Sequence, residues 1–353
     1  MEYSHGGDVE SYRLEHGTAP LDFSSNGNPL GMPKVAHKAI AAAAKRAHEY
    51  PDPHCRELRK AIAKSQGVSY DHILCGNGAA DIIYRLALAL QPKKALTVAP
   101  TFSEYGESLA IAKTEVVAHQ LLREEGFRVT ERILDDITPD IDVVYLCTPN
   151  NPTGLLVEPE LMDAIVERCH ESDALLVVDE CFMGFVEDAD RYTLRHRVAC
   201  DENLLILDAF TKLYGMAGLR LGFCISSNTE LLEKIYGVGQ PWSVSAIAQA
   251  AGTAVLKRTG RYLEKTHELV RTERAWLAKK LRKLGFEVYE GAADYLFFIA
   301  ERTDLAEQMR ERSILIRDCS NYRGLMPGAY RVAVRAHEEN TQLVRAFKDV
   351  LKG

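Results

Sequence analysis

The chain has 353 residues, of which 46% are hydrophobic and 26% are charged, and its formal net charge at pH 7 is −7. This composition is ordinary for a globular enzyme and unlike that of a disordered or fibrous chain. The acidic balance excludes a broad positive field, so we expect neither a nucleic acid nor a membrane as partner. No run approaches the roughly 18 apolar residues of a membrane helix and no leader pattern opens the chain, which predicts a cytoplasmic protein.

The eight cysteines are scattered and include no C-x-x-C pair. Because no His-rich segment stands at metal-ligand spacing, they predict buried thiols and no metal site. Asp179, Glu180 and Cys181 form the one ambiguous cluster, but consecutive residues of a strand point to opposite faces.

The first part of the chain is rich in Gly, Ser, Asn and Pro, which predicts an irregular arm over residues 1–30. A helix is expected over 33–48, where Tyr50-Pro51-Asp52-Pro53 ends it, and a second helix over 55–65.

Short apolar runs then alternate with helical patterns. The runs predict strands over 72–75, 95–99, 116–119, 143–147, 174–179 and 204–207, with helices over 79–90, 103–112 and 159–171. Strands that are apolar throughout are covered on both faces, so these βα units predict an α/β fold with a mostly parallel sheet. We expect this large domain to span residues 31–238.

Beyond residue 228 the pattern changes to long, polar-faced helices and a βαβ-like tail. The helices are expected over 244–256, 261–284 and 338–351, and the strands over 286–289, 295–300, 314–316 and 330–334. They predict a smaller α+β domain over residues 239–353.

Ligands bind at the carboxyl ends of parallel strands, so the residues after each run are the ones to inspect. Gly76-Asn77-Gly78-Ala79 follows the first run and opens a helix, and such a helix N-terminus suits a phosphate group. The loop also resembles a dinucleotide-binding fingerprint, although Asp81 replaces its third glycine. A plain strand-to-helix turn is the other interpretation.

Two polar residues follow the next buried runs. Asn151 precedes Pro152, which holds it extended, so its amide can bond a ring substituent. A simple turn would explain the same residues. Asp179 ends an apolar run, where a carboxylate is costly to bury without a cation such as a protonated ring nitrogen. The alternative is a carboxylate that caps the following turn.

Lys212 follows the run at 204–207 and is isolated among apolar and small residues. Desolvation there favours a neutral amine that can form a Schiff base, whereas a structural lysine reaching solvent is the alternative. Arg220 stands in the glycine-containing stretch that follows. The order of anion-binding loop, amide, carboxylate, lysine and arginine describes a site for pyridoxal phosphate (PLP).

Several further motifs extend this pattern over nearly the whole chain. They are His5-Gly6-Gly7, the segment from Asp22 to Gly31, Tyr50-Pro51-Asp52, Pro241-Trp242-Ser243-Val244, Ile314-Leu315-Ile316-Arg317 and the segment from Tyr330 to Arg335. With them the chain resembles the fold-type I PLP enzymes of the aspartate aminotransferase superfamily. Its His-Gly-Gly and Ile-Arg motifs are similar to those of the L-threonine-O-3-phosphate decarboxylases of cobalamin biosynthesis, a family related to the histidinol-phosphate aminotransferases.

The resemblance implies a role for each candidate residue. Lys212 would bind the cofactor covalently, Asp179 would pair with its ring nitrogen and Asn151 would contact its ring oxygen. Phe102 would stack on the ring, and Tyr50 would reach the cofactor of the neighbouring subunit in a homodimer with shared active sites. The cofactor phosphate would be held by Gly78, Ala79, Thr211 and Arg220, and the phosphorylated amino acid substrate by His5, Asn26, Arg317 and Arg331.

Two residues depart from the superfamily pattern. Phe182 stands where a tyrosine usually bonds the ring oxygen, and Ala209 where a Ser or Thr usually helps to hold the phosphate. The implied reaction is PLP-dependent decarboxylation of L-threonine O-3-phosphate to (R)-1-amino-2-propanol O-2-phosphate, with histidinol-phosphate-type transamination as the alternative. Lys212, Asp179 and Arg331 together argue against a non-catalytic binding protein, and the incomplete glycine pattern argues against a nicotinamide-dependent oxidoreductase.

Overall fold

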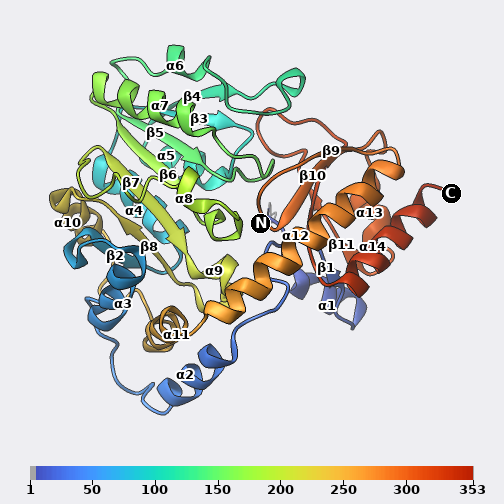
Figure 1. Ribbon diagram of the computed structural model, residues 1–353, viewed down its shortest axis with the longest axis horizontal. Helices are drawn as coiled ribbons and strands as arrows, with labels where there is room; N and C mark the ends of the chain where they lie inside the picture. Colours follow the sequence, from blue (N-terminus) through green and yellow to red (C-terminus); the bar gives the residue numbers. More distant parts are fainter. Residues whose placement is uncertain (1–4, 353) are drawn as a thin grey trace.

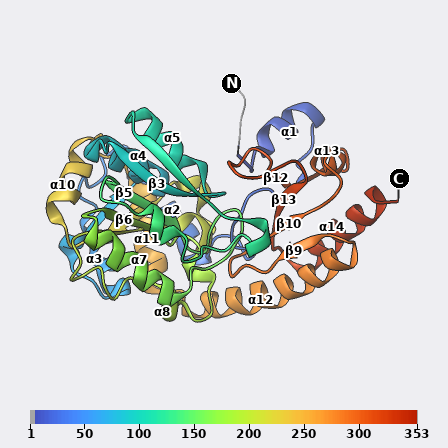
Figure 2. The ribbon, with the colours of Figure 1, turned by 90° about the horizontal axis from the view of Figure 1, so that it is seen from above.

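Of the three β-sheets in the described part of the chain, a larger and a smaller one organise the molecule (Figure 1). The computed structural model describes residues 5–352. In this part of the chain, the larger sheet has seven strands in the order β2-β8-β7-β6-β5-β3-β4, and the smaller sheet has four in the order β12-β13-β10-β9. Figures 1 and 2 both show the long helix α12 (Gly260–Lys283) extending from the larger sheet toward the smaller one.

The larger sheet confirms the predicted α/β fold. Its strands are β2 (Ile73–Gly76), β3 (Lys94–Ala99), β4 (Glu115–Gln120), β5 (Val143–Cys147), β6 (Leu175–Asp179), β7 (Leu204–Ala209) and β8 (Gly222–Ile225). The pairs formed by β3 to β7 are parallel, while β8 runs antiparallel to both β2 and β7. The sequence pattern did not predict β8, which begins at a glycine and has only four residues.

Both faces of this sheet are covered, as its continuous apolar strands require. Along β5, Val144 and Leu146 enter one hydrophobic cluster, whereas Val143 and Tyr145 enter another. The alternation follows the strand pleat, in which successive side chains point to opposite faces.

Helices accompany these strands along the chain. They are α2 (Lys34–Ala44), α3 (Arg56–Gln66), α4 (Ala79–Leu90), α5 (Ser103–Ile111), α6 (Ile133–Asp136), α7 (Pro159–Glu171), α8 (Ala189–Tyr192), α9 (Phe210–Leu213), α10 (Thr229–Gly237) and α11 (Ala246–Lys257). Single 3₁₀ turns cover Tyr70–His72, Arg123–Glu125, Met183–Phe185 and Ala217–Leu219. Although α11 lies beyond residue 238, it packs against α2 and α3. The domain boundaries at 30 and 238 stay predictions.

The smaller sheet contains the βαβ-like unit that the sequence predicted. It consists of β9 (Glu287–Tyr289), β10 (Tyr295–Ile299), β12 (Arg317–Asp318) and β13 (Ala329–Ala333), accompanied by α13 (Leu305–Arg310) and α14 (His337–Val350). All of its strand pairs are antiparallel. Since β10 and β12 are both antiparallel to β13, they run parallel to each other, and α13 connects them along the chain, with β13 inserted between them in the sheet.

The N-terminal segment is more ordered than predicted. It contains α1 (Val9–His16) and β1 (Leu21–Asp22), so the prediction of an irregular arm is wrong for these residues. The Asp8 side chain accepts a hydrogen bond from the Ser11 backbone N–H, and Gly17 ends the helix in the left-handed conformation. β1 pairs in parallel with β11 (Ile314–Leu315), which joins this segment to the C-terminal part of the chain.

All eight cysteines lie in the described part of the chain, and seven of them are buried, as predicted. Cys200 is exposed, because it lies in the turns between α8 and β7 rather than in a strand. Within residues 5–352, no helix is both long enough and apolar enough to cross a membrane.

Candidate active site

A cavity of about 690 Å³ opens where the carboxyl ends of β5, β6 and β7 face the N-terminal segment and the smaller sheet. Apart from Gly78 and Tyr50, every residue that the sequence assigns to the site lines this cavity: His5, Asn26, Ala79, Phe102, Asn151, Asp179, Thr211, Lys212, Arg220, Arg317 and Arg331. Phe182 and Ala209 line it as well. Parallel strands end at one edge of the sheet, which is why residues so far apart in sequence meet here.

Lys212 lies in the short helix α9, directly after β7. Its Nζ donates a hydrogen bond to the backbone oxygen of Asn26 at 3.2 Å, and its own carbonyl accepts one from the Asn28 N–H at 3.1 Å. The amine is 5.7 Å from the centre of the Phe182 ring. Burial lowers the pKa of Lys212, so the site favours a neutral, nucleophilic amine.

Asp179 is the last residue of β6, and only 5% of its surface is exposed. Oδ2 accepts a hydrogen bond from the Tyr105 hydroxyl at 2.7 Å, and Oδ1 accepts one from the Cys181 N–H at 2.9 Å. Both donors are neutral, so they orient the carboxylate without compensating its charge. Nothing in the sequence pattern singles out Tyr105 except its place one helical turn after Phe102.

Arg331 connects three parts of the chain at the inner wall. It lies in β13 and is buried, its Nη2 donates to the Ser24 carbonyl at 2.8 Å, and its Nη1 donates to the Asn151 side-chain oxygen. Asn151 also accepts a hydrogen bond from the Tyr322 hydroxyl at 3.3 Å. Among the described residues, Arg331 Nε and Asn26 Oδ1 are buried without a hydrogen-bond partner. The inner wall therefore offers polar atoms that the protein itself does not satisfy.

The N-terminus of α4 forms another wall. Gly78 caps this helix at φ 86°, and a Cβ there would lie 2.7 Å from Nη2 of Arg220. A Cβ at Gly222 would lie 2.4 Å from the Ala79 nitrogen. Gly78 does not line the cavity, but it allows the Arg220 guanidinium to approach the helix N-terminus. Free N–H groups beside a guanidinium make a site for a phosphate group.

Arg317 and Arg331 are adjacent across the smaller sheet, because they are register partners of the antiparallel strands β12 and β13. Directly opposed residues share one face of a sheet, and both of these arginines line the cavity. The Arg317 Nη2 donates to the Asn321 side chain at 2.8 Å, and its guanidinium carbon is 5.1 Å from the centre of the Tyr322 ring.

His5 contacts an acidic residue that the sequence pattern did not single out. Its Nε2 lies 2.8 Å from Oε1 of Glu104, and this contact lowers the pKa of Glu104. Glu107 adds a third potential metal ligand, since atoms of the three side chains lie within 4.8 Å of one another. The absence of a metal site stays a prediction.

Tyr50 does not enter the cavity of its own chain. Its side chain is 80% exposed, and its ring lies 4.6 Å from the Trp242 ring, centre to centre. That Tyr50 reaches the cofactor of a partner subunit stays a prediction.

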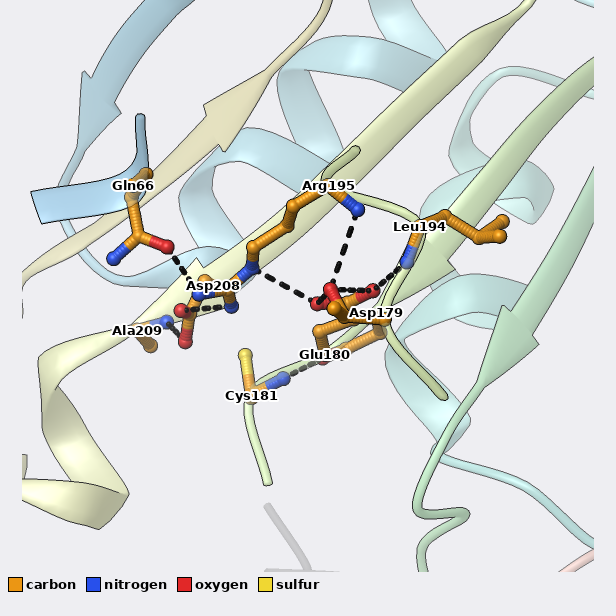
Figure 3. A network of polar contacts seen from close by, with 9 residues as sticks. Gln66, Asp179, Glu180, Cys181, Leu194, Arg195, Asp208 and Ala209 are labelled. Carbon is orange, nitrogen blue, oxygen red and sulfur yellow. Dashed lines mark hydrogen bonds and ion pairs between the residues drawn. The ribbon is translucent and has the colours of Figure 1, made fainter. Parts of the chain in front are cut away.

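A second group of charges lies behind the strand ends. Figure 3 shows the Arg195 guanidinium reaching between Glu180 and Asp208. Its Nε donates to Glu180 at 3.0 Å, its Nη2 donates to Asp208 at 2.6 Å, and its Nη1 donates to Gln66. Burial raises the pKa of Asp208 to about 6, although the charge of Arg195 opposes the shift. We call Glu180, Arg195, Asp208 and Gln66 the rear network.

The rear network touches the cavity wall through chain neighbours. Glu180 follows Asp179, and Asp208 precedes Ala209, whose N–H donates to the Asp208 carboxylate at 2.6 Å. Glu180 is completely buried and accepts further hydrogen bonds from Thr193 and Leu194. Both strand ends are thus fixed next to the residues that face the cavity.

The sequence as a whole decides the family. Residues 18–347 match the family described as aminotransferase class I and II. The chain belongs to this family. The resemblance expected from the motifs is thereby confirmed.

Relatives within this aminotransferase family include both decarboxylases and aminotransferases. The threonine-phosphate decarboxylase of Salmonella typhimurium is 36% identical over 356 residues, which cover 99% of this chain and 97% of that protein. The adenosylcobalamin biosynthesis bifunctional protein CobDQ of Leptospira interrogans is 28% identical, over 99% of this chain but 41% of that longer protein. The solved structure of the histidinol-phosphate aminotransferase from Clostridium acetobutylicum superposes with a TM-score of 0.88 at 30% identity, covering 94% of this chain and 99% of that one.

PLP is the cofactor of this aminotransferase family and of this chain. The cavity fits it on four counts. Lys212 supplies a desolvated amine, Asp179 a carboxylate whose charge its donors leave uncompensated, and Phe102 an aromatic face in the wall. The α4 N-terminus beside Arg220 supplies the phosphate site.

Proposed function

We propose that this protein is a PLP-dependent threonine-phosphate decarboxylase, which converts L-threonine O-3-phosphate to (R)-1-amino-2-propanol O-2-phosphate for cobalamin biosynthesis. The observation that carries the proposal is the register pairing of Arg317 with Arg331 on one face of the smaller sheet. Two guanidinium groups side by side match a small substrate with two anionic groups. The 36% identity to a threonine-phosphate decarboxylase over 99% of the chain supports the same substrate.

The two arginines would bind different ends of that substrate. Arg331 is buried beside Asn151 and retains an unsatisfied Nε, which suits the amino acid carboxylate. Arg317 is less buried and lies with His5 in the cavity wall, which suits the substrate phosphate. Asn26 completes the substrate site from the N-terminal segment.

The cofactor would be held by residues of the larger sheet. Asp179 would hold a proton on the ring nitrogen, Asn151 would contact the ring oxygen and Phe102 would stack on the ring. The phosphate would lie at the α4 N-terminus, held by Gly78, Ala79, Thr211 and Arg220. PLP, when bound, supplies the electron sink for the bond that breaks at the substrate Cα.

Lys212 would have two roles: it would bind the cofactor covalently and would transfer a proton at the substrate Cα. By holding the substrate phosphate, Arg317 and His5 would orient the substrate and so determine which bond at its Cα breaks. Loss of the carboxylate gives decarboxylation, whereas proton removal by Lys212 gives transamination. Phe182 cannot hydrogen-bond the ring oxygen, which leaves that contact mainly to Asn151. Ala209 has no hydroxyl group, so Thr211 and Arg220 would contribute more of the contacts to the cofactor phosphate.

The decisive experiment supplies the PLP-loaded protein with O-phosphothreonine and measures released CO₂ and the amine product. We expect stoichiometric CO₂ and aminopropanol phosphate, with Lys212→Ala as the inactive control. Keto product formed with histidinol phosphate and 2-oxoglutarate, without CO₂, would instead establish the aminotransferase, the alternative that the 30% identical Clostridium acetobutylicum enzyme favours. Arg317→Met should slow phosphorylated substrates selectively, and equal loss on unphosphorylated amino acids would contradict its assignment.

The proposal includes a cytoplasmic homodimer with shared active sites and a chain divided into residues 1–30, 31–238 and 239–353. Exposed Tyr50 and its neighbour Trp242 support a contact with a second copy. Mixing Lys212→Ala with Tyr50→Ala tests the sharing, because a mixed dimer would contain one site with both residues intact. Activity that returns on mixing supports the proposal, and two variants that stay inactive together oppose it.

A further inference from the structure

Asp81 stands where the dinucleotide-binding fingerprint has its third glycine, and the proposed mechanism gives it no role. It lies three residues after Gly78, the cap of α4, and therefore in the first turn of this helix. The helix dipole favours a carboxylate at that place. The same carboxylate would repel a phosphate group bound at the helix N-terminus, so its presence there requires an explanation.

The Asp81 carboxylate folds back onto the loop that precedes the helix. Its Oδ2 accepts a hydrogen bond from the Asn77 N–H at 2.8 Å. Gly76 leaves room for this contact, because a Cβ there would lie 3.0 Å from the same oxygen and 2.6 Å from Cγ1 of Ile82. The contact is similar to a capping box, in which an acidic side chain of the first turn reaches back to a backbone N–H. It fixes the conformation of the turn at 76–78.

Arg85 compensates the charge of this carboxylate from one helical turn further along α4. Its Nε donates to Oδ1 of Asp81 at 3.0 Å, and its Nη2 lies 2.9 Å from Oδ2. Two parallel contacts of this kind make a strong and geometrically specific ion pair. Arg85 is buried, and a Cβ at Gly239 would lie 2.3 Å from its guanidinium carbon. The backbone at Gly239 therefore confines the guanidinium beside Asp81.

The fixed turn leads directly into the cavity wall. Gly78, at φ 86°, joins the turn to Ala79 and Ala80, and these two alanines line the cavity. The first N–H groups of a helix have no partner within it. A phosphate group in the cavity would meet these N–H groups, and their direction depends on the turn before them.

We propose that Asp81 and Arg85 are positioning residues for the cofactor phosphate. Asp81 fixes the turn that directs the first N–H groups of α4, and Arg85 cancels the charge that would otherwise repel the phosphate. Neither side chain lines the cavity, so both act through the backbone and the local field rather than by touching the cofactor. The inference rests on the proposed function, because it takes the α4 N-terminus as the phosphate site.

The test compares how tightly the apoprotein binds PLP and pyridoxal, which lacks the phosphate, in titrations read by visible absorbance. The parent should bind PLP more tightly than pyridoxal. Arg85→Met leaves the Asp81 carboxylate uncompensated, so the Kd of PLP should rise by about tenfold or more while the Kd of pyridoxal stays the same. A variant that keeps the parent's ratio of the two Kd values would overturn the inference.

Two double variants of equal charge separate the turn from the field. Asp81→Asn with Arg85→Met removes the charge but keeps an oxygen for the Asn77 N–H, so it should recover most of the PLP affinity. Asp81→Ala with Arg85→Met removes that oxygen as well and should stay weak for PLP alone. Equal PLP affinity of the two double variants would refute the role of the turn.

Hydrogen exchange at the Asn77 N–H of the apoprotein gives a readout that needs no cofactor. Exchange should be slow in the parent and in the variant with Asn at position 81, and faster in the variant with Ala there. Unchanged exchange in the Ala variant would contradict the fixed turn. Thermal unfolding and the retained affinity for pyridoxal verify that each variant folds.

Glu57→Ala is the matched control, because Glu57 lies in the first turn of α3 and pairs with Lys60 at 2.8 Å. It should keep the affinities for both PLP and pyridoxal, and a loss equal to that of Arg85→Met would contradict a specific pair. A parent that binds PLP no more tightly than pyridoxal would refute the phosphate site of the proposed function itself. A parent that distinguishes the two ligands, beside an Arg85→Met variant that distinguishes them equally well, would refute only the positioning role.

Discussion

The two sides of the β6 and β7 ends treat buried charge in opposite ways. In the rear network, Arg195 hydrogen-bonds both Glu180 and Asp208 (Figure 3). In the cavity wall, Arg331 Nε and Asn26 Oδ1 are buried without a partner among the described residues. The ion pairs of the rear network hold the strand ends in place. The polar atoms of the cavity wall that lack a partner are available to bind other molecules.

The strand pleat produces this division from adjacent residues. Asp179 lines the cavity while Glu180 binds Arg195, and Ala209 lines the cavity while Asp208 binds Arg195. A substitution on the cavity side should therefore lower catalytic activity, and one on the rear side should lower the free energy of unfolding.

The largest expected effect is that of Lys212→Ala on the cavity side. Turnover should fall by roughly 10³-fold or more, because proton transfer at the substrate is lost along with covalent cofactor attachment. The free energy of unfolding of the apoprotein should not fall, because a desolvated amine is removed. Steady-state assays measure turnover and urea unfolding measures stability. A large loss of stability would contradict the distinction between the cavity side and the rear network.

For Arg195→Met in the rear network we expect the opposite result, a large loss of stability. Glu180 and Asp208 would lose their shared cation, and removing one partner of a buried ion pair costs about 3 to 5 kcal/mol. Urea unfolding of the apoprotein measures the change. Asp208→Asn in the same background should recover part of it, whereas a variant with full stability and poor activity would show that the network serves chemistry instead.

Asp294→Asn, at a completely buried carboxylate just before β10, should change how stability depends on pH. Burial raises the pKa of Asp294 from its ordinary 3.8 to about 6, so ionisation destabilises the fold increasingly as pH rises through this window. The variant lacks this loss, and the difference in unfolding free energy between variant and parent should grow by up to about 3 kcal/mol from pH 4 to pH 7. A constant difference across that range would show that Asp294 does not titrate there.

Tyr322→Phe should have the smallest effect. It removes a single long hydrogen bond, 3.3 Å from the hydroxyl to the Asn151 side chain. Such a bond contributes about 1 kcal/mol, which corresponds to a several-fold increase in KM for the phosphorylated substrate. Arg331 also holds Asn151, so kcat should change little. Loss of activity comparable to that of Lys212→Ala would give Tyr322 a larger role than its geometry indicates.

Local sequence signals predicted most of the larger sheet. The strand at 143–147 is found at those residues, because its apolar run is continuous and turn residues bound it. β8 was missed since four residues beginning with glycine carry little periodic signal, and its place between β2 and β7 depends on distant pairing. α1 was missed although Asp8 and Gly17 are typical of helix ends.

The candidate site shows the same limit. Residues that follow buried strands were found because topology alone brings strand ends together. Tyr105, Glu104 and Arg195 were not, since their contacts with Asp179, His5 and Glu180 depend on packing between segments remote in sequence. Asp81 did leave a signal, since it replaces the third glycine of the fingerprint.

The burial of all but one thiol turns Cys200 into a natural attachment point for a probe. A maleimide dye should react there in the native protein, while the shielded thiols stay unmodified. One preparation labelled with a donor dye and another with an acceptor would exhibit energy transfer after mixing only if subunits associate and exchange. The chain can thus report its own assembly in solution without any engineered cysteine.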